Sequence, residues 1–413
     1  MTDFELGPGM LSPDQRLALA REWDELLDEI QGVPGFEDFL RPPSYEALLP
    51  ASAEGPVIVV NVSRWRCDAL IVTSAGVATV PLPGLSLEDA HDRLVGHLHA
   101  LEVLETAVQK WETAKSARRE GDHKSILDLQ SAGRARGTAA VMVETALGET
   151  CEWLWDAVVA PVLPYLPIPE VSAESPRVWW CPTGPLALLP IHAAGRGDDW
   201  LADMVVSSYT PTLRGLVEAR SRDVDRAAAR DRFLLASTMP EGAALGEGPL
   251  AGLDRTDLID CSTREATLAG LSEARYVHFH CHADQNLQDP AQGGFQLDDD
   301  VIRVFDLAEL ALRGEFAGLA ACKTAVGGTE LLDESITLAA ALHYSGFRHV
   351  VGGLWIVAED AAASVFSSVY TELAATGRFL PDESARALAT AVNDLRRSGE
   401  ELHRWAPFIH IGP

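Results

Sequence analysis

Two apolar stretches, each ending in a reactive side chain, decide how this chain folds. Residues 276–283 read Tyr-Val-His-Phe-His-Cys-His-Ala, and residues 316–325 read Phe-Ala-Gly-Leu-Ala-Ala-Cys-Lys-Thr-Ala. Short apolar runs of this kind are typical of strands buried in a parallel sheet. Active sites in such sheets lie beyond the carboxyl ends of the strands. His282 and Cys322 stand at those ends, and a cysteine near a histidine is what a thiolate nucleophile requires.

Further apolar runs surround these two and alternate with helical patterns. From residue 177 onward the sequence predicts strands at 178–181, 233–237, 276–280, 316–321 and 349–354. Helices are expected at 263–271, 335–344 and 361–374. Strands that are apolar on both faces and alternate with helices predict an α/β fold, with a mostly parallel sheet flanked by helices.

The first half of the chain mixes a strand pair with long helices. Apolar spacing predicts a helix over 13–31, a hairpin of strands at 57–62 and 69–73, and helices near 86–111 and 138–163. Residues 114–137 are polar and contain three glycines, which predicts a surface linker. Its arginines make this linker a candidate site of self-cleavage; they are Arg118, Arg119, Arg134 and Arg136.

Charge and cysteine content narrow the class of protein. Asp and Glu outnumber Lys and Arg by 61 to 33, and this net charge of -28 argues against nucleic acid and against anionic membranes as partners. The first residues lack the basic and apolar regions of a signal peptide, and no apolar run is long enough to span a membrane. The six cysteines are scattered, which favours reduced thiols. We therefore expect a cytoplasmic protein.

Five blocks of the second half, in the same order, resemble the CHAT-domain family. The block at 276–282 resembles the family's histidine strand, and Leu-Ala-Ala-Cys-Lys-Thr-Ala-Val-Gly at 319–327 resembles its Leu-Ser-Ala-Cys-Glu-Thr-Ala-x-Gly. Residues 346–355, followed by Asp360, resemble its Gly-Thr-Leu-Trp…Asp block. The remaining two blocks are the entry segment at 182–190 and the closing Trp-Ala-Pro-Phe block at 405–412.

The resemblance implies a caspase- and separase-like cysteine peptidase. On this reading Cys322 attacks the scissile carbonyl and His282 is the general base and acid. The oxyanion would be held by the backbone N–H groups of Ala283 and Cys322. The family implies no metal or organic cofactor, a protein or peptide substrate, and a possible activating protein partner.

Other residues near these blocks are candidates for a substrate pocket. Ala320, two residues before the cysteine, suggests an uncharged residue on the amino side of the cleaved bond (P1). Asp284, Asp289 and Asp360 would instead favour a basic P1, and Trp355 could line the pocket. Ala283 also replaces the glycine that usually follows the family's histidine, which matters only if that position needs a positive φ.

We expect three segments along the chain. Residues 1–44 form an amino-terminal helical segment, and residues 45–175 a helix-rich scaffold. Residues 176–413 form the caspase-like CHAT peptidase domain. Separases carry a degenerate caspase-like half before the active half, and the resemblance implies the same scaffolding role for residues 45–175.

Two other function classes remain open. A CHAT fold without turnover would be an interaction or signalling module, since a fold does not guarantee activity. His278, His280 and His282 alternate along one predicted strand, which admits a metal-dependent hydrolase as a remote alternative. Four other cysteines are expected to be core residues, and Cys281 is expected to point away from His280 and His282; the four are Cys67, Cys151, Cys181 and Cys261.

Overall fold

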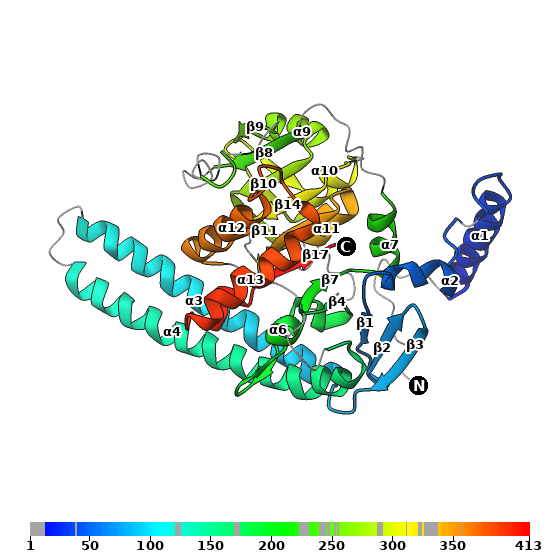
Figure 1. Ribbon diagram of the computed structural model, residues 1–413, viewed down its shortest axis with the longest axis horizontal. Coiled ribbons are helices and arrows are strands. Elements are labelled where there is room, and N and C mark those ends of the chain that lie inside the picture. The colour runs from blue at the N-terminus through cyan, green and yellow to red at the C-terminus, as the bar shows by residue number, and fades with distance from the viewer. Residues whose placement is uncertain are drawn as a thin grey trace. The chain divides into compact units, whose positions relative to one another are not determined.

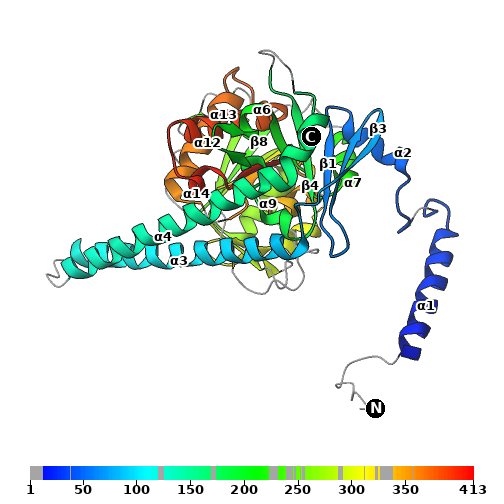
Figure 2. The ribbon, with the colours of Figure 1, turned by 90° about the horizontal axis from the view of Figure 1, so that it is seen from below.

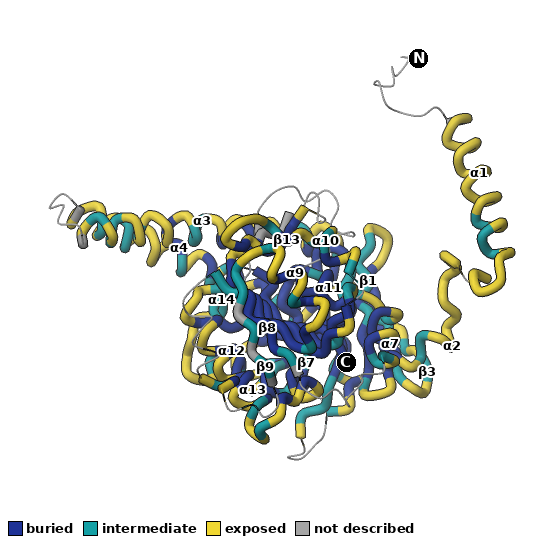
Figure 3. The backbone as a smooth tube through the Cα atoms, turned by 90° about the horizontal axis from the view of Figure 1, so that it is seen from above, coloured by how far each residue is buried: buried dark blue, intermediate teal, exposed yellow. Residues whose placement is uncertain are grey.

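A computed structural model of the chain describes most of its residues. The described residues are 13–37, 39–119, 125–168, 174–222, 231–238, 245, 248–251, 253, 256–286, 292–310, 312–320, 324–325, 338–355 and 357–413. They fall into two compact units, Met1–Pro50 and Ala51–Pro413. In the first unit, α1 (Pro13–Gln31) confirms the predicted amphipathic helix, and its apolar residues Leu19, Trp23 and Leu26 are exposed (Figure 3).

An eleven-stranded sheet forms the centre of the second unit (Figure 1). Its strands, in spatial order, are β3 (Gly76–Pro81), β2 (Asp68–Thr73), β1 (Val57–Asn61), β4 (Arg177–Pro182), β7 (Val206–Tyr209), β17 (Phe408–Ile411), β16 (His349–Gly353), β14 (Phe316–Leu319), β10 (Tyr276–His280), β8 (Asp231–Ser237) and β9 (Thr256–Cys261). A smaller sheet contains β13 (Val301–Arg303), β12 (Gly294–Gln296), β11 (His282–Asn286) and β15 (Thr324–Ala325), and β5 (Gly195–Arg196) pairs with β6 (Asp199–Trp200).

The main sheet consists of two halves whose parallel strands run in opposite directions. β8, β9, β10, β14 and β16 are parallel to one another. β17 is antiparallel to β16 but parallel to β7, which is parallel to β4 and β1. The carboxyl ends of β1, β4 and β7 therefore lie at the edge where β10, β14 and β16 begin. β17, which comes from the closing block at 405–412, lies in the middle of the sheet and not at its edge.

Helices surround this sheet. The longer ones are α3 (Leu87–Arg119), α4 (Ser125–Leu154), α7 (Leu213–Ser221), α9 (Arg264–Glu273), α11 (Leu338–Ser345), α12 (Glu359–Leu373) and α13 (Ser384–Arg397). Short helices and turns of this unit are the π-helical η2 (Trp155–Val159), α5 (Ala160–Val162), η3 (Leu163–Tyr165), η4 (Gly184–Leu188), η5 (Ile191–Ala193), α6 (Leu201–Met204), α10 (Val304–Ala308), η8 (Pro381–Glu383) and α14 (Leu402–Trp405). α2 (Tyr45–Leu48) belongs to the first unit, and η1 (Leu49–Ser52) spans the boundary between the units. Within the described ranges, no helix has the length and apolar character that crossing a bilayer demands.

Consecutive residues of β14 show that α11 and α12 cover opposite faces of the sheet. A Cβ added to Gly318 would meet Phe366 and Tyr370 of α12. The next residue, Leu319, lies with Ala339 of α11 around Gly352. Successive side chains of a strand point to opposite faces, so the sheet is covered on both sides, as the sequence predicts.

The α3–α4 pair corrects the prediction of a linker at 114–137. The chain is helical up to Arg119 and again from Ser125, so Gly133 and Gly137 lie inside α4. The two helices run side by side (Figure 2), and Arg136 lies over the ring of Trp111 at 4.3 Å from its centroid. Packing of one helix on another outweighs the helix-breaking tendency of single glycines. A helical segment is also a poor site for self-cleavage, because peptidases bind extended chain.

The predicted α/β fold is confirmed, with some elements missed. All five strands expected after residue 177 are present, although residue 321 lies outside the described part. The hairpin at 57–73 is confirmed as β1 and β2. β3, β7 and β9 were not predicted. The division at residues 44 and 175 stays a prediction: β1 and β4 are neighbours in one continuous sheet.

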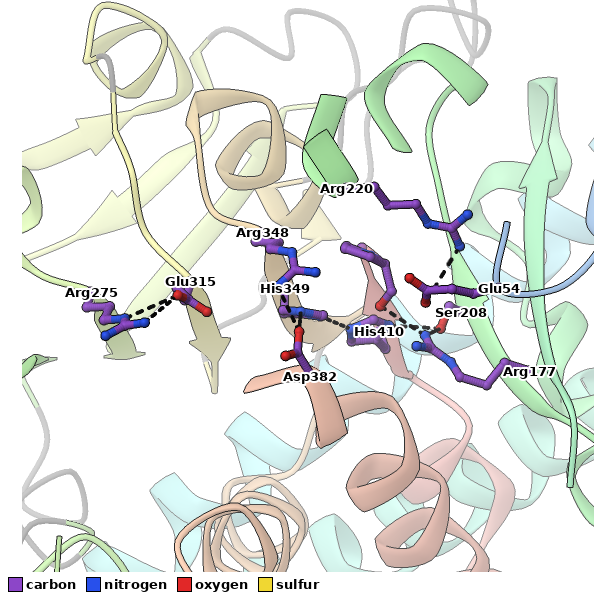
Figure 4. Close-up of polar contacts among 12 residues, drawn as sticks. Glu54, Arg177, Ser208, Arg220, Arg275, Glu315, Arg348, His349, Asp382 and His410 are labelled. Carbon is purple, nitrogen blue, oxygen red and sulfur yellow. Dashed lines mark hydrogen bonds and ion pairs between the residues drawn. The ribbon is translucent and has the colours of Figure 1, made fainter. Parts of the chain in front are cut away.

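A chain of buried hydrogen bonds crosses the junction of the two halves (Figure 4). His349 Nε2 lies 3.3 Å from Asp382, His349 Nδ1 lies 3.1 Å from His410 Nε2, and His410 Nδ1 lies 2.9 Å from Ser208 Oγ. Because a carboxylate only accepts, His349 carries its proton on Nε2, His410 then donates from Nε2, and Ser208 donates to His410. Burial lowers the pKa of both histidines, which agrees with this neutral arrangement.

Buried neutral histidines make the fold sensitive to acid, and His97 of α3 tests this. His97 is 1% exposed, neither ring nitrogen has a hydrogen-bond partner among the described residues, and burial lowers its pKa to about 4. Its stabilising neutral form is fully present above the unfolded pKa of about 6.5 and stability is lost as pH falls toward 4. This loss is about 1.4 kcal/mol per pH unit.

We expect His97→Leu to be more stable than wild type at pH 5, by roughly 2 kcal/mol, with a smaller gain at pH 7.5. Urea unfolding at both pH values measures the difference. His99→Leu is the matched control, because His99 lies on the same helix with its side chain 67% exposed. Equal pH dependence of wild type and His97→Leu would show that His97 is not buried as a neutral ring.

Candidate active site

The carboxyl ends of β10 and β14 lie next to each other. The two strands are parallel neighbours, with Phe279 opposite Leu319. One residue later, the backbone N–H of Ala320 donates to the carbonyl of Phe279 at 2.9 Å. The strand that leads to His282 and the strand that leads to Cys322 therefore run in register up to their ends.

Beyond those ends the same two segments pair a second time. In the smaller sheet β11 and β15 are parallel, with Gln285 opposite Thr324 and Asn286 opposite Ala325. Between the two pairings the chain has residues 280–284 on one side and residues 320–323 on the other. His282 belongs to the first interval and Cys322 to the second. Both intervals are short and are held together at each end.

His282 begins β11 and is exposed to solvent, opposite Gln296 of β12. Ala283 follows it, buried and opposite Phe295. Among the described non-glycine residues, Leu40 alone has a positive φ. The alanine at 283 is therefore unstrained, and its N–H is retained although the family usually has glycine there. Cys322, the predicted nucleophile, lies outside the described residues.

The structure corrects the placement of the three histidines on one strand. β10 ends at His280, and His282 begins a strand of the other sheet. His278 is buried, and its Nδ1 lies 2.7 Å from the Tyr370 hydroxyl. Burial lowers the pKa of His278 to about 3. A search of the described ranges finds no group of three or more His, Cys, Asp or Glu residues suited to a metal ion.

The candidate pocket residues have different surroundings. Ala320 is half-buried at the end of β14. Asp284 belongs to β11, opposite Gly294, and Asp289 lies outside the described residues. Asp360, at the start of α12, accepts a hydrogen bond of 2.8 Å from Arg404, which holds its pKa below the usual value. This ion pair ties α12 to the closing block of the chain.

Trp355, the fifth pocket candidate, is covered by a helix of the first half. It lies two residues beyond β16, is 1% exposed, and has its ring centroid 4.6 Å from that of His97 in an edge-on contact. Its indole N–H has no hydrogen-bond partner in the part of the chain that the structure describes. The sequence offered no signal for this contact, because His97 lies 258 positions away on a helix that was predicted only from its apolar spacing.

Four of the remaining cysteines are buried, and the fifth is half-buried. The buried thiols are Cys67, Cys151, Cys181 and Cys281, and Cys261 is the half-buried one. Burial raises the pKa of Cys151 and of Cys181 to about 12. Thiols with such a pKa form almost no thiolate at neutral pH, so these two are core residues, as predicted.

Comparison with protein families decides the family. A model described as the CHAT domain matches residues 148–413. The chain belongs to the CHAT-domain family. A search of curated proteins finds no match. The family match begins inside α4 and includes every strand from β4 onward.

Two solved separase structures support a caspase-like fold. A separase–securin complex from Saccharomyces cerevisiae matches with a TM-score of 0.56 and 10% identity, covering 89% of this chain and 30% of that chain. A second structure of that complex gives a TM-score of 0.55 at 10% identity, covering 96% and 31%. RgpB of Porphyromonas gingivalis has a TM-score of 0.40 at 9% identity, covering 65% and 68%. The CHAT chain thus spans about a third of the separase chain.

Ala283 stands where the family usually has glycine, and the effect of this difference can be tested by substitution. We expect Ala283→Gly to lower the free energy of unfolding by about 0.5–1 kcal/mol and to leave the alkylation rate of Cys322 unchanged, because φ there is already accessible to alanine. Urea unfolding and timed alkylation measure the two effects. Ala236→Gly, at a buried position of β8, is the control for the stability loss. Faster alkylation in Ala283→Gly alone would mean that the reactive state needs a positive φ.

Proposed function

We propose that this CHAT protein is a cysteine endopeptidase that uses Cys322 and His282. The observation that carries the proposal is the double pairing of the two segments, Phe279 with Leu319 and Gln285 with Thr324. His282 lies three residues before the second pairing and Cys322 two residues before it. Parallel pairing on both sides favours an arrangement in which the imidazole and the thiol face each other.

The proposed reaction has two steps. The Cys322 thiolate adds to the scissile carbonyl, and the tetrahedral oxyanion collapses to a thioester as the protonated His282 gives its proton to the leaving amine. His282 then removes a proton from water, which attacks the thioester and releases the carboxylic acid and the thiol. The N–H groups of Ala283 and Cys322 would hold the oxyanion. The exposure of His282 leaves it accessible to substrate and water.

The proposed substrate is a protein or peptide with an uncharged P1 residue. Ala320 supports an apolar pocket beside the nucleophile, and the Arg404 ion pair of Asp360 removes one reason to expect a basic P1. A protein partner that controls activity is also proposed. The matched separase structure is a complex with securin, and a controlling protein partner for this chain is proposed by analogy with that complex.

A second candidate is an interaction module without turnover. The observation that favours it is the closed state of Trp355, which lies buried beneath His97 with no exposed ring to offer a substrate. Opening of α3 would be needed before this indole could contact a peptide. A CHAT protein that never opens would bind partners through its surface and cleave none.

Thiol labelling distinguishes the two candidates. We expect iodoacetamide to alkylate Cys322 at least tenfold faster than Cys261 at pH 6.5, because a nearby imidazole stabilises the thiolate. The His282→Ala variant should lose the faster alkylation of Cys322. The control is His280→Ala, a substitution of a neighbouring histidine. Peptide mapping by mass spectrometry at timed points from pH 5 to 9 provides the rates for all six thiols.

A cleavage assay then completes the test. Incubation of wild type and Cys322→Ala with a mixed peptide library should yield cleaved products from wild type alone, with small or apolar P1 residues. A Cys322 that reacts no faster than Cys261, together with an uncleaved library, would favour the interaction module. A reactive Cys322 with an uncleaved library would instead indicate an assembled site that cleaves only when a partner protein is bound.

A further inference from the structure

A pocket lies at the amino ends of β14 and β16, on the opposite edge of the sheet from His282. Its volume is about 400 Å³, which is within the range of small-molecule sites. Residues of α10 and α11, the segment that leads into β14, and Arg222 line it: Arg222, Val304, Ala308, Leu310, Leu312, Arg313, Ala341, Tyr344, Ser345 and Gly346. Most of the lining is apolar, and the charged residues are both arginines.

Arg222 is half-buried in this pocket without a carboxylate partner among the described residues. Its Nη1 lies 3.5 Å from the carbonyl oxygen of His343, which is too long for a good hydrogen bond. That carbonyl already accepts a hydrogen bond from the N–H of Gly346 at 3.3 Å, so it has a partner at the end of α11 without the arginine. The negative charge of Glu218 raises the pKa of Arg222, but Glu218 is paired with Arg214 at 2.8 Å.

Three other partly buried arginines each have a carboxylate partner. Figure 4 shows Arg220, Arg275 and Arg348 with Glu54, Glu315 and Asp382, at N–O distances of 3.9, 2.6 and 2.8 Å. A guanidinium that is partly removed from water is costly unless an anion compensates for the lost hydration. Burial lowers the pKa of Arg222, because partial removal from water disfavours the charged guanidinium.

Arg313 adds a second positive charge at the rim. It is exposed, and no ion pair joins it to any described residue. The chain as a whole carries a net charge of -28, so a pocket whose charged residues are arginines alone runs against its composition. Two guanidinium groups beside an apolar floor match an anion that is attached to an apolar body.

We propose that this pocket binds a carboxylate carried on an apolar group, with Arg222 pairing the carboxylate and Leu310, Leu312 and Tyr344 covering the apolar part. The ligand is either a small carboxylic acid or the carboxyl terminus of a peptide that ends in an apolar residue. Binding here needs neither Cys322 nor His282, so the site is independent of the proposed peptidase activity.

The test uses 4-phenylbutyrate as the probe and calorimetric titration of the full chain. We expect 4-phenylbutyrate to bind at one site and its uncharged amide to bind at least tenfold more weakly, because charge-assisted pairing to a guanidinium is lost. Arg222→Gln and Arg313→Gln should each weaken phenylbutyrate binding, Arg222→Gln by tenfold or more. Arg64→Gln, at an exposed arginine of the loop between β1 and β2, should leave it unchanged.

Two further arms identify the source of the carboxylate. A peptide acetyl-Ala-Ala-Phe that binds more tightly than phenylbutyrate, and whose C-terminal amide does not bind, would assign the site to a peptide terminus. Phenylbutyrate binding with no peptide binding would assign it to a small acid. Equal affinity of phenylbutyrate and its amide would overturn the proposal.

Discussion

The position of β17 is the constraint on which the rest of the structure depends. This last strand is antiparallel to β16 and parallel to β7, so it joins two sets of parallel strands that run in opposite directions. Hydrogen bonds cross the junction from Asp382 at the surface through the buried residues His349, His410 and Ser208, with one consistent set of proton positions. A strand that ended before His410 would leave His349 and Ser208 without their shared partner in the core, at the cost of unsatisfied buried polar groups.

This reversal places the proposed active site and the proposed carboxylate pocket at opposite edges of the sheet. The carboxyl ends of β10 and β14 gather His282 and the segment that leads to Cys322 at one edge. The carboxyl ends of β4 and β7 lie at the other edge, with the amino ends of β14 and β16 and the arginine-lined pocket. A ligand at one edge and a substrate at the other would therefore be connected by β14 and β16 themselves, whose residues are buried along their whole length.

The sequence predicts those features whose signal is local. Five strands of the second half, the hairpin at 57–73 and the α/β class follow from short apolar runs, and the CHAT blocks identify the family. The linker at 114–137 was mispredicted because glycine content describes a propensity, whereas the packing of α3 on α4 decides the structure. Nor could spacing reveal that β17 lies centrally, that His282 leaves the strand of His278, or that Arg404 binds Asp360. These depend on contacts between residues far apart in the chain.

The contact between His97 and Trp355 bears on whether this fold acts as an enzyme. Other buried histidines have a hydrogen bond on at least one ring nitrogen, as His278 has with Tyr370 and His349 with His410. At the carboxyl end of β16, both nitrogens of His97 and the indole N–H of Trp355 have no hydrogen-bond partner among the described residues. Each such group costs about 1–3 kcal/mol. Proteins tend to break local rules of this kind at functional sites. A peptide could reach this indole only if α3 moved, so a helix of the first half lies over the carboxyl end of β16, beside the edge where Cys322 and His282 are proposed to act.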